Sequence, residues 1–511
     1  MERMKICQAL VTIDAERSSR YLEEIRQITY ANELEEGIRN FDSSRLFVNQ
    51  EGLVEWAQKN LEEDFSRYRS LRNTSLPDLA EIKTAILSMH TDRDAAVPQA
   101  LLEQPKTEAD RLLIDLAQRL LREFLHGTQF GLNSYLSLRI RHGSLAGHLR
   151  GPLEEAGAIA LRESAPGAYQ RISRWDSLLE GLGNGVKEAF HSAFSRFSDR
   201  FDVEVTYLVD ELLQIRSDSK PNGSFDLSVN AFLMNLLKGS VDDTTDVQDF
   251  AKVCIAHFKA SLDPDLVRVR LYISRTFKAT VDKDFDELLK AIDALDSGGA
   301  LSPVADAVKR ARTSLSFAAD RVSDWFQSLD RGDHERRYSI EQIIRMGERL
   351  TTNTRPAFLP VVTIDAEGDI PDFTPHSGAF LVADALFIVF DNAYLHSGIE
   401  GRIAITVKVT LTSEKLVFDV LNEAAHGCDS EESRARLEEI RAKMQSGEYS
   451  KMAFGEGGTG LFKLMRLTEK SASEPEESLT FGFEAEGFRV KFQIPIREAI
   501  VEDEENENSD C

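Results

Sequence analysis

The chain has 511 residues and a formal net charge of −25, because 61 Lys and Arg residues stand against 86 Asp and Glu residues. Nucleic-acid backbones are bound by clustered basic side chains, so this charge excludes a general nucleic-acid binder. The hydrophobic content of 42% and the 14 prolines exclude collagen-like and wholly disordered chains, and the length predicts about three domains.

The cysteines and the apolar stretches indicate where the protein works. The four cysteines lie far apart and lack the spacing of a zinc site, which is typical of a reducing compartment. The first residues have no apolar signal-peptide core, and the longest apolar stretch, 379–390, is too short to span a bilayer. We therefore expect a cytoplasmic protein that does not contact a membrane.

The first two-thirds of the chain have helical periodicity. Apolar residues recur at three- and four-residue spacing, as at Leu113, Leu116 and Leu120. This pattern predicts a large N-terminal all-helical region with turns near 95–107 and 217–224, where Pro and Gly gather. We place the boundaries of its two domains at 1–100 and 101–338.

A helical hairpin is expected at 282–329, with its turn at Ser297, Gly298 and Gly299. The apolar stripes of such a pair are covered either by internal packing or by a partner molecule. Both alternatives are open at this point.

The period changes after residue 340, where β-branched and aromatic runs alternate with helical patterns. This arrangement predicts an α+β sandwich over 339–498, with a mixed, mostly antiparallel sheet and helices on one face. The last segment, 499–511, is rich in carboxylates and is expected to be a disordered acidic tail. The predicted strands are 361–364, 402–411, 415–421, 478–486 and 488–496, and the predicted helices are 381–396, 431–444 and 461–468.

A glycine-rich loop before the helix at 461–468 indicates a phosphate site. Glycines let the backbone approach a ligand, and the N–H groups at the start of a helix favour an anion. A glycine cluster before a helix can also be an ordinary turn. The loop lacks the spacing of a P-loop or a dinucleotide fingerprint, and its glycines are Gly455, Gly457, Gly458 and Gly460.

The apolar helix at 381–396 carries two polar residues that suit a nucleotide site. The amide oxygen of Asn392 is a hard ligand that suits Mg²⁺ beside phosphate oxygens. Its alternative role is to cap a neighbouring strand. His396 lies one turn later on the same face, where it could also be a partly exposed histidine at a helix end.

Together, these pieces resemble the ATP-binding domain of the GHKL superfamily, and most closely the catalytic domain of histidine kinases. The resemblance covers residues 340–497: a helix containing Asn392, a strand ending at Asn422, a variable lid at 424–454, the glycine loop and a closing hairpin. It implies ATP and Mg²⁺ as cofactors, Asn392 as the metal ligand and Asn422 as the adenine reader. Thr459, Gly460 and Leu461 would lie at the phosphates, and His396 would line the same site.

Two positions depart from the family pattern. Asn422 stands where the family usually has Asp, so it accepts the adenine N–H without the help of a negative charge. Ile388, one turn before Asn392, replaces a catalytic Glu or a second amide. Asp391 could replace that base only if the helix were rotated. Nucleotide binding is therefore better supported than turnover.

A kinase also needs a phosphoacceptor histidine. Residues 124–153 contain no Asp or Glu but include Arg139, Arg141 and His142. We predict that His142 is the phosphoacceptor, or part of an anion site with the two arginines. The alternative is a basic helix face docked on an acidic surface of the same chain. His334 is the rival acceptor, but its charged surroundings are typical of a linker.

Two functions follow. The first is an ATP-dependent, histidine-kinase-like phosphotransferase in bacterial signalling, of the stress or phage-defence kind. Its expected partners are a second copy of the chain, as a homodimer, and a response regulator or effector. The second is an ATP-operated switch that regulates a protein partner with little or no phosphotransfer.

Overall fold

The computed structural model describes residues 2–43, 45–72, 99–128, 130–141, 143–163, 167–242, 244–296, 298–327, 336–373, 378–412, 415–452, 458–468 and 478–495. These residues form two compact units. One unit combines residues 1–44 with 331–511, and the other comprises residues 45–330. The first 44 residues therefore belong with the C-terminal unit, which differs from the boundary that we placed at residue 100.

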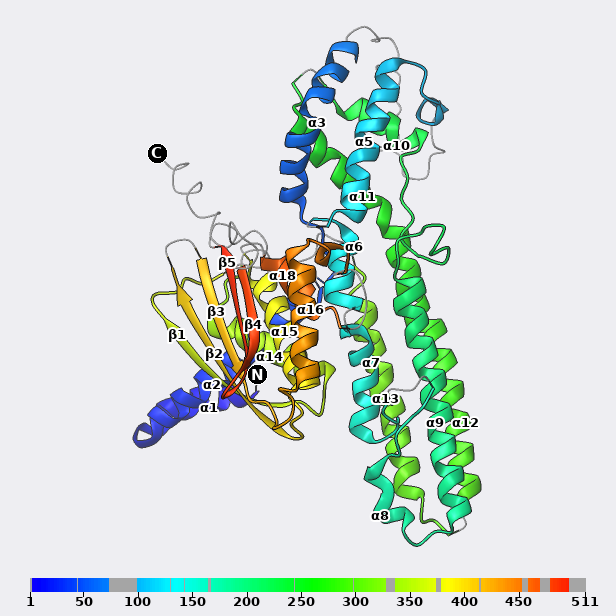
Figure 1. The fold of residues 1–511 in the computed structure, drawn as a ribbon, viewed down its shortest axis with the longest axis vertical. Helices are drawn as coiled ribbons and strands as arrows, with labels where there is room; N and C mark the ends of the chain where they lie inside the picture. The colour runs from blue at the N-terminus through cyan, green and yellow to red at the C-terminus, as the bar shows by residue number, and fades with distance from the viewer. Residues whose placement is uncertain are drawn as a thin grey trace. The chain divides into compact units, whose positions relative to one another are not determined.

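The helical unit has one continuous hydrophobic core. Its longest run joins α11, the π-helical segment Tyr272–Phe277 and α12 without a break. Figure 1 shows α9, α12, α13 and α7 lying along one another in this unit. Its α-helices are α3 (Gln50–Arg72), α5 (Glu108–His126), α6 (Leu132–Tyr135), α7 (Ser144–Ala156), α8 (Asp176–Leu179), α9 (Asn184–Tyr207), α10 (Ala231–Ser240), α11 (Val247–Leu271), α12 (Lys278–Leu295) and α13 (Ser302–Asp324).

The segment for which we expected a hairpin contains α12 and α13, which pack on each other. Both helices are amphipathic, and both bury their apolar stripes within the unit. Leu288 and Ile292 of α12 and Leu315 of α13 are among the buried residues. The internal-packing alternative therefore accounts for these stripes.

The C-terminal unit contains a five-stranded sheet in the order β1-β2-β3-β5-β4. β1 is parallel to β2, and the other neighbours are antiparallel. Alternate residues of β2 are buried and exposed, as expected for a sheet with helices on one face. The strands are β1 (Leu359–Glu367), β2 (Arg402–Leu411), β3 (Lys415–Asn422), β4 (Leu479–Glu484) and β5 (Gly487–Pro495).

Helices pack on one face of this sheet (Figure 1). α15 is apolar almost throughout and is correspondingly buried. Ser339 and Gln342 form a capping box that starts α14, a helix that the sequence analysis did not identify. The helices are α14 (Ile340–Thr354), α15 (Phe380–His396), α16 (Glu431–Gln445), α17 (Tyr449–Met452) and α18 (Gly460–Thr468). The predicted α+β class is confirmed.

Two N-terminal helices, α1 (Glu2–Ile13) and α2 (Ser18–Ser43), complete this unit. The end of α2 is anchored on α14 and α15, where Phe41 contacts Phe380 edge-on at 5.3 Å between ring centroids. The side chain of Asn40 donates a hydrogen bond to the Tyr338 hydroxyl at 3.1 Å. These contacts fix the second half of α2 on the sheet domain.

No helix in the described part of the chain is both long and apolar enough to cross a membrane. The predicted acidic tail, 499–511, lies outside the described residues.

Candidate functional site

The predicted nucleotide residues gather at the C-terminal end of α15. Gly460, the first residue of α18, lies directly against Asn392. A β-carbon on Gly460 would be 3.1 Å from Asn392 Oδ1 and 3.3 Å from Ile388 Cγ2. A β-carbon would therefore be tightly placed here, and glycine leaves room for the two segments to approach. The fold brings together two motifs that are 68 residues apart.

The Asn392 amide remains available to a ligand. Asn392 is partly buried, and its side chain makes no hydrogen bond to any described residue. The alternative of a strand-capping amide is therefore not supported. Among the described residues, no group of three or more His, Cys, Asp or Glu side chains could hold a metal ion. An amide oxygen such as that of Asn392 is a ligand that magnesium accepts together with phosphate oxygens.

The glycine segment forms the second side of the site. Gly458 has a φ of +68°, which favours glycine. Thr459 is buried, and Leu461 lies in the first turn of α18 and is partly buried. Gly455 and Gly457 lie outside the described residues. The backbone N–H groups at the start of α18 are suited to phosphate oxygens.

The sequence analysis missed Arg436. It lies on α16 within the predicted lid, and its Nη2 atom would be 3.2 Å from a β-carbon on Gly458. Arg436 forms no ion pair with another described residue. Its place in the predicted lid, opposite the glycine loop, was the signal that could have identified it, since a guanidinium there suits a phosphate.

His396 ends α15 and lies close to Arg436. Partial desolvation and the positive charge of Arg436 lower the pKa of His396, against an opposing effect of Asp391. His396 is exposed and makes no hydrogen bond to a described residue. In its neutral form it can donate or accept one hydrogen bond at the edge of the site.

Asn422 is buried at the last position of β3. Its Nδ2 atom donates a hydrogen bond to the Glu423 carbonyl at 2.8 Å. The chain then turns onto the end of α15, where the Ala425 N–H donates to the Ser397 carbonyl at 2.7 Å. Asn422 thus lies on the segment that leads directly into the site.

The lid helix α16 is attached to the sheet edge. Arg441 donates a hydrogen bond to the Phe481 carbonyl of β4, and its guanidinium lies 5.1 Å from the Phe481 ring centroid. Met444 is buried at the end of the same helix. These contacts hold α16 in place at its C-terminal half, while Arg436 lies nearer its start.

The structure provides no obvious catalytic base on α15. Ile388 is fully buried against Gly460. Asp391 is buried and paired with Arg355, whose Nε lies 2.7 Å from Oδ1. Asp391 therefore does not replace the missing base, and the described groups suit binding a polyphosphate rather than activating a nucleophile.

The described arginines of the predicted basic face around 135–150 are not exposed to solvent. Arg141 is buried and donates hydrogen bonds to Asn133 and Gln214. Arg139 is buried between aromatic rings, 5.2 Å from that of Phe47 and 5.3 Å from that of Tyr135. The segment that carries them, Leu136–Arg141, is buried throughout. His142 and His334 lie outside the described residues.

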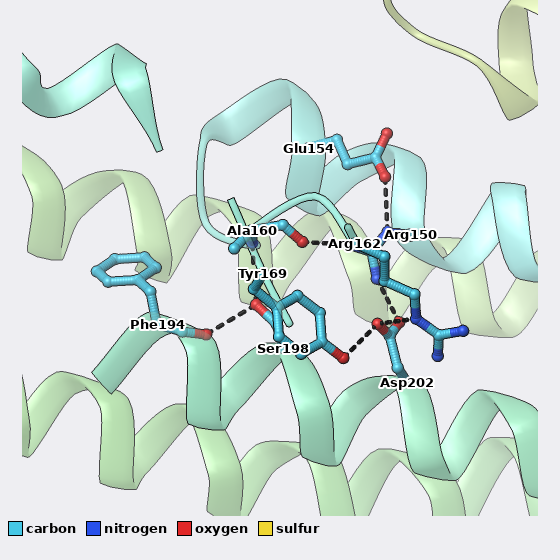
Figure 2. Close-up of polar contacts among 8 residues, drawn as sticks. All are labelled: Arg150, Glu154, Ala160, Arg162, Tyr169, Phe194, Ser198 and Asp202. Carbon is cyan, nitrogen blue, oxygen red and sulfur yellow. Dashed lines mark hydrogen bonds and ion pairs between the residues drawn. The ribbon is translucent and has the colours of Figure 1, made fainter. Parts of the chain in front are cut away.

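The same basic segment also supplies Arg150 to a polar cluster (Figure 2). Asp202 on α9 is buried and accepts hydrogen bonds from Arg150, from Arg162 Nε at 2.6 Å and from the Tyr169 hydroxyl at 2.9 Å. Ser198 Oγ accepts the Ala160 N–H at 2.9 Å. The cluster anchors the loop that follows α7 on α9, so for Arg150 the alternative of docking on an acidic group is supported.

We expect Tyr169 to give the protein an alkaline limit of stability. Burial and the neighbouring Asp202 raise the pKa of Tyr169 to about 12. When the pKa of a group is higher in the folded chain than in the unfolded chain, the group stabilises the fold at every pH below its unfolded-state pKa. This contribution is lost as the pH rises through its folded-state pKa. Above the ordinary tyrosine pKa, the free energy of unfolding should therefore fall less steeply with pH in Tyr169→Phe than in the unaltered chain. Denaturant unfolding at several pH values measures this dependence. An unchanged pH dependence would contradict this assignment.

Comparisons with known proteins match both parts of the chain. The Y4jQ family model matches residues 55–326. A second model, described as "y4jQ C-terminal putative histidine kinase domain", matches residues 339–493. The "Uncharacterized protein y4jQ" of Sinorhizobium fredii (strain NBRC 101917 / NGR234) is 25% identical over 506 residues, which cover 97% of this chain. The match covers 47% of that relative, so the chain spans about half of its length.

Proposed function

The chain belongs to the Y4jQ family, and we propose that its C-terminal unit binds ATP with Mg²⁺ as a GHKL-type domain of a histidine-kinase-like signalling protein. The observation that carries the proposal is the contact of Gly460 with Asn392. An amide oxygen of the kind that binds Mg²⁺ lies there beside backbone N–H groups suited to phosphates, which supports the proposal. The family description of residues 339–493 as a kinase domain supports the same reading.

The proposed roles follow from where each residue lies. Asn392 would hold Mg²⁺, and the N–H groups from Gly458 to Leu461 would bind phosphates. The amide oxygen of Asn422 would accept a hydrogen bond from the adenine amino group, since the amide nitrogen already donates to the Glu423 carbonyl.

Arg436 would add a positive charge from the lid, and His396 would contact the nucleotide at the edge of the site. Magnesium, when bound, would supply charge neutralisation between phosphate oxygens.

Phosphotransfer to histidine is the first candidate reaction, with a response regulator or effector as the protein that receives the signal. Incubation with labelled ATP should give an acid-labile, alkali-stable phosphoprotein. His142 is the acceptor that the sequence favours, so His142→Ala should abolish the label and His334→Ala should leave it. Labelling that persists in His142→Ala would remove His142 from this role.

An ATP-operated switch is the second candidate, and one specific observation favours it. The position one turn before Asn392 is the buried Ile388, and the neighbouring Asp391 is paired with Arg355. A domain that binds ATP without a base would act through the lid helix α16. Tight ATP binding without any phosphoprotein or released phosphate would select this candidate.

Removal of the Arg436 charge should weaken ATP binding. We expect Arg436→Ala to raise the Kd for ATP by about tenfold, because a charge-assisted hydrogen bond to phosphate is worth about 1.5–3 kcal/mol. This rise in Kd should be smaller at high salt, because salt screens the charge of Arg436. The matched control is Arg434→Ala on the same helix, since Arg434 is paired with Asp429 at 2.5 Å. Equal effects of the two substitutions, measured by calorimetry, would contradict a specific role for Arg436.

A further inference from the structure

The chain crosses between its two compact units twice, at the boundaries given above. Buried side chains flank both crossings. Phe41 precedes the first crossing and Arg45 follows it. Trp325 precedes the second crossing and Tyr338 follows it. Each of these four residues is at most 2% exposed, so each crossing is anchored by packing in both units.

Within the C-terminal unit, both crossings are anchored at the start of α15. Phe380 is the first residue of this helix. Its ring contacts that of Phe41 edge-on and lies 6.1 Å from that of Tyr338, measured between centroids. The bond from Asn40 to the Tyr338 hydroxyl joins the two chain segments. The helix that ends at the proposed nucleotide site therefore begins where both crossings are held.

Within the helical unit, the two crossings are joined directly. The Arg45 guanidinium lies 4.0 Å from the ring centroid of Trp325. Its Nη1 atom donates a hydrogen bond to the Arg139 carbonyl at 2.7 Å. The ring of His148 on α7 contacts Trp325 edge-on, 4.9 Å away between centroids. A cation over a Trp ring is held more strongly when it is buried, so Arg45 links both crossings to the segment that carries Arg139.

This segment, Leu136–Arg141, is π-helical. π-helical turns are rare and frequently lie at functional sites. The ordinary i→i+4 turn is the alternative to the i→i+5 turn, so the segment has two discrete arrangements. The hydrogen bond from Arg45 to the Arg139 carbonyl stabilises the π-helical one. His142, the phosphoacceptor that the sequence favours, directly follows the segment.

We propose that the two crossings form one joint, through which ATP binding at the end of α15 sets the arrangement of Leu136–Arg141. This inference rests on the proposed ATP site. α15 is a buried helix of 17 residues, so a shift at Asn392 reaches Phe380 through packed side chains. Phe380 contacts Phe41, and Arg45 follows Phe41 by four positions. The coupling is reciprocal, so the arrangement of the segment also affects the affinity for ATP.

The joint is tested first without nucleotide, which separates its failure from that of the ATP site. Phe41→Leu alters the C-terminal unit and should raise hydrogen exchange at residues 136–141 of the full chain by about fivefold or more. The matched control is Phe492→Leu, which makes the same change in a buried ring pair of the sheet, 4.8 Å from Phe418 between centroids. It should leave residues 136–141 unchanged. Unaltered exchange at these residues in Phe41→Leu would overturn the joint.

ATP with Mg²⁺ then tests the transmission. Saturating ATP should change the exchange of residues 136–141 by about fivefold in the unaltered chain. Arg45→Lys keeps the charge but loses the planar guanidinium, so this change should disappear while the protection of residues 458–468 remains. The matched control is Arg174→Lys, since Arg174 also lies over a Trp ring and donates to a backbone carbonyl. It should retain the change.

The outcomes at the two segments are distinct. Protection of residues 458–468 without any change at residues 136–141 would overturn the inference and leave the ATP site standing. A change at residues 136–141 that persists in Arg45→Lys would likewise overturn the route through Arg45. Absence of protection at residues 458–468 in the unaltered chain would contradict the ATP site, and with it the transmission of ATP binding.

Discussion

Asn392→Ala is expected to abolish the magnesium dependence of ATP binding. The Asn392 amide is the available oxygen donor beside Gly460, and Mg²⁺ links a protein ligand to phosphate oxygens. The Kd for ATP with Mg²⁺ should rise by about 100-fold, to the value that the unaltered chain shows without the metal. Calorimetric titrations with and without Mg²⁺ measure both values.

Two controls accompany this result. Asn60→Ala removes an exposed asparagine of the helical unit and should leave ATP binding unchanged. Thermal unfolding of Asn392→Ala should match that of the unaltered chain, because the partly buried amide has no hydrogen-bond partner among the described residues to lose. If the substitution left magnesium-dependent binding intact, Asn392 would not be the metal ligand.

Arg355→Ala should destabilise the C-terminal unit strongly. Asp391 is 6% exposed at its side chain and depends on Arg355 for its pairing. Removal of one partner leaves a buried, uncompensated carboxylate, which costs about 3–5 kcal/mol of unfolding free energy. Hydrogen exchange of the β2 and β3 amides in denaturant measures this loss within the unit itself.

The control for this prediction is Arg349→Ala, an exposed arginine of α14 six residues earlier, which should change the stability by less than about 0.5 kcal/mol. Asp391→Asn in the Arg355→Ala background should recover part of the loss, since the buried group is then neutral. A loss below about 1 kcal/mol in Arg355→Ala would mean that the pair behaves as a surface ion pair.

Local patterns predicted the C-terminal fold well. The alternation in β2 and the largely apolar α15 follow from residues close in sequence, and the structure reproduces them within a few residues. The glycine-rich loop likewise indicated the start of α18. These features depend on backbone conformation and on burial of one face, which a short stretch of sequence specifies.

Features that depend on tertiary contacts were missed. The absence of acidic residues from 124–153 suggested an exposed basic face, but Arg139 and Arg141 are buried. Composition alone cannot distinguish a charge held in the core from one that faces solvent. Arg436 was missed for a related reason, since only the packing of α16 brings it to Gly458. The docking of α2 on α14 also joins segments about 300 residues apart.

Hydrogen exchange of the full chain, with and without ATP and Mg²⁺, tests the central claim most directly. The account predicts slower exchange on ATP addition at the end of α15, in α16 and at residues 458–468, with little change in α3 or α5 of the helical unit. Absence of protection at these segments at millimolar ATP would contradict the proposed nucleotide site.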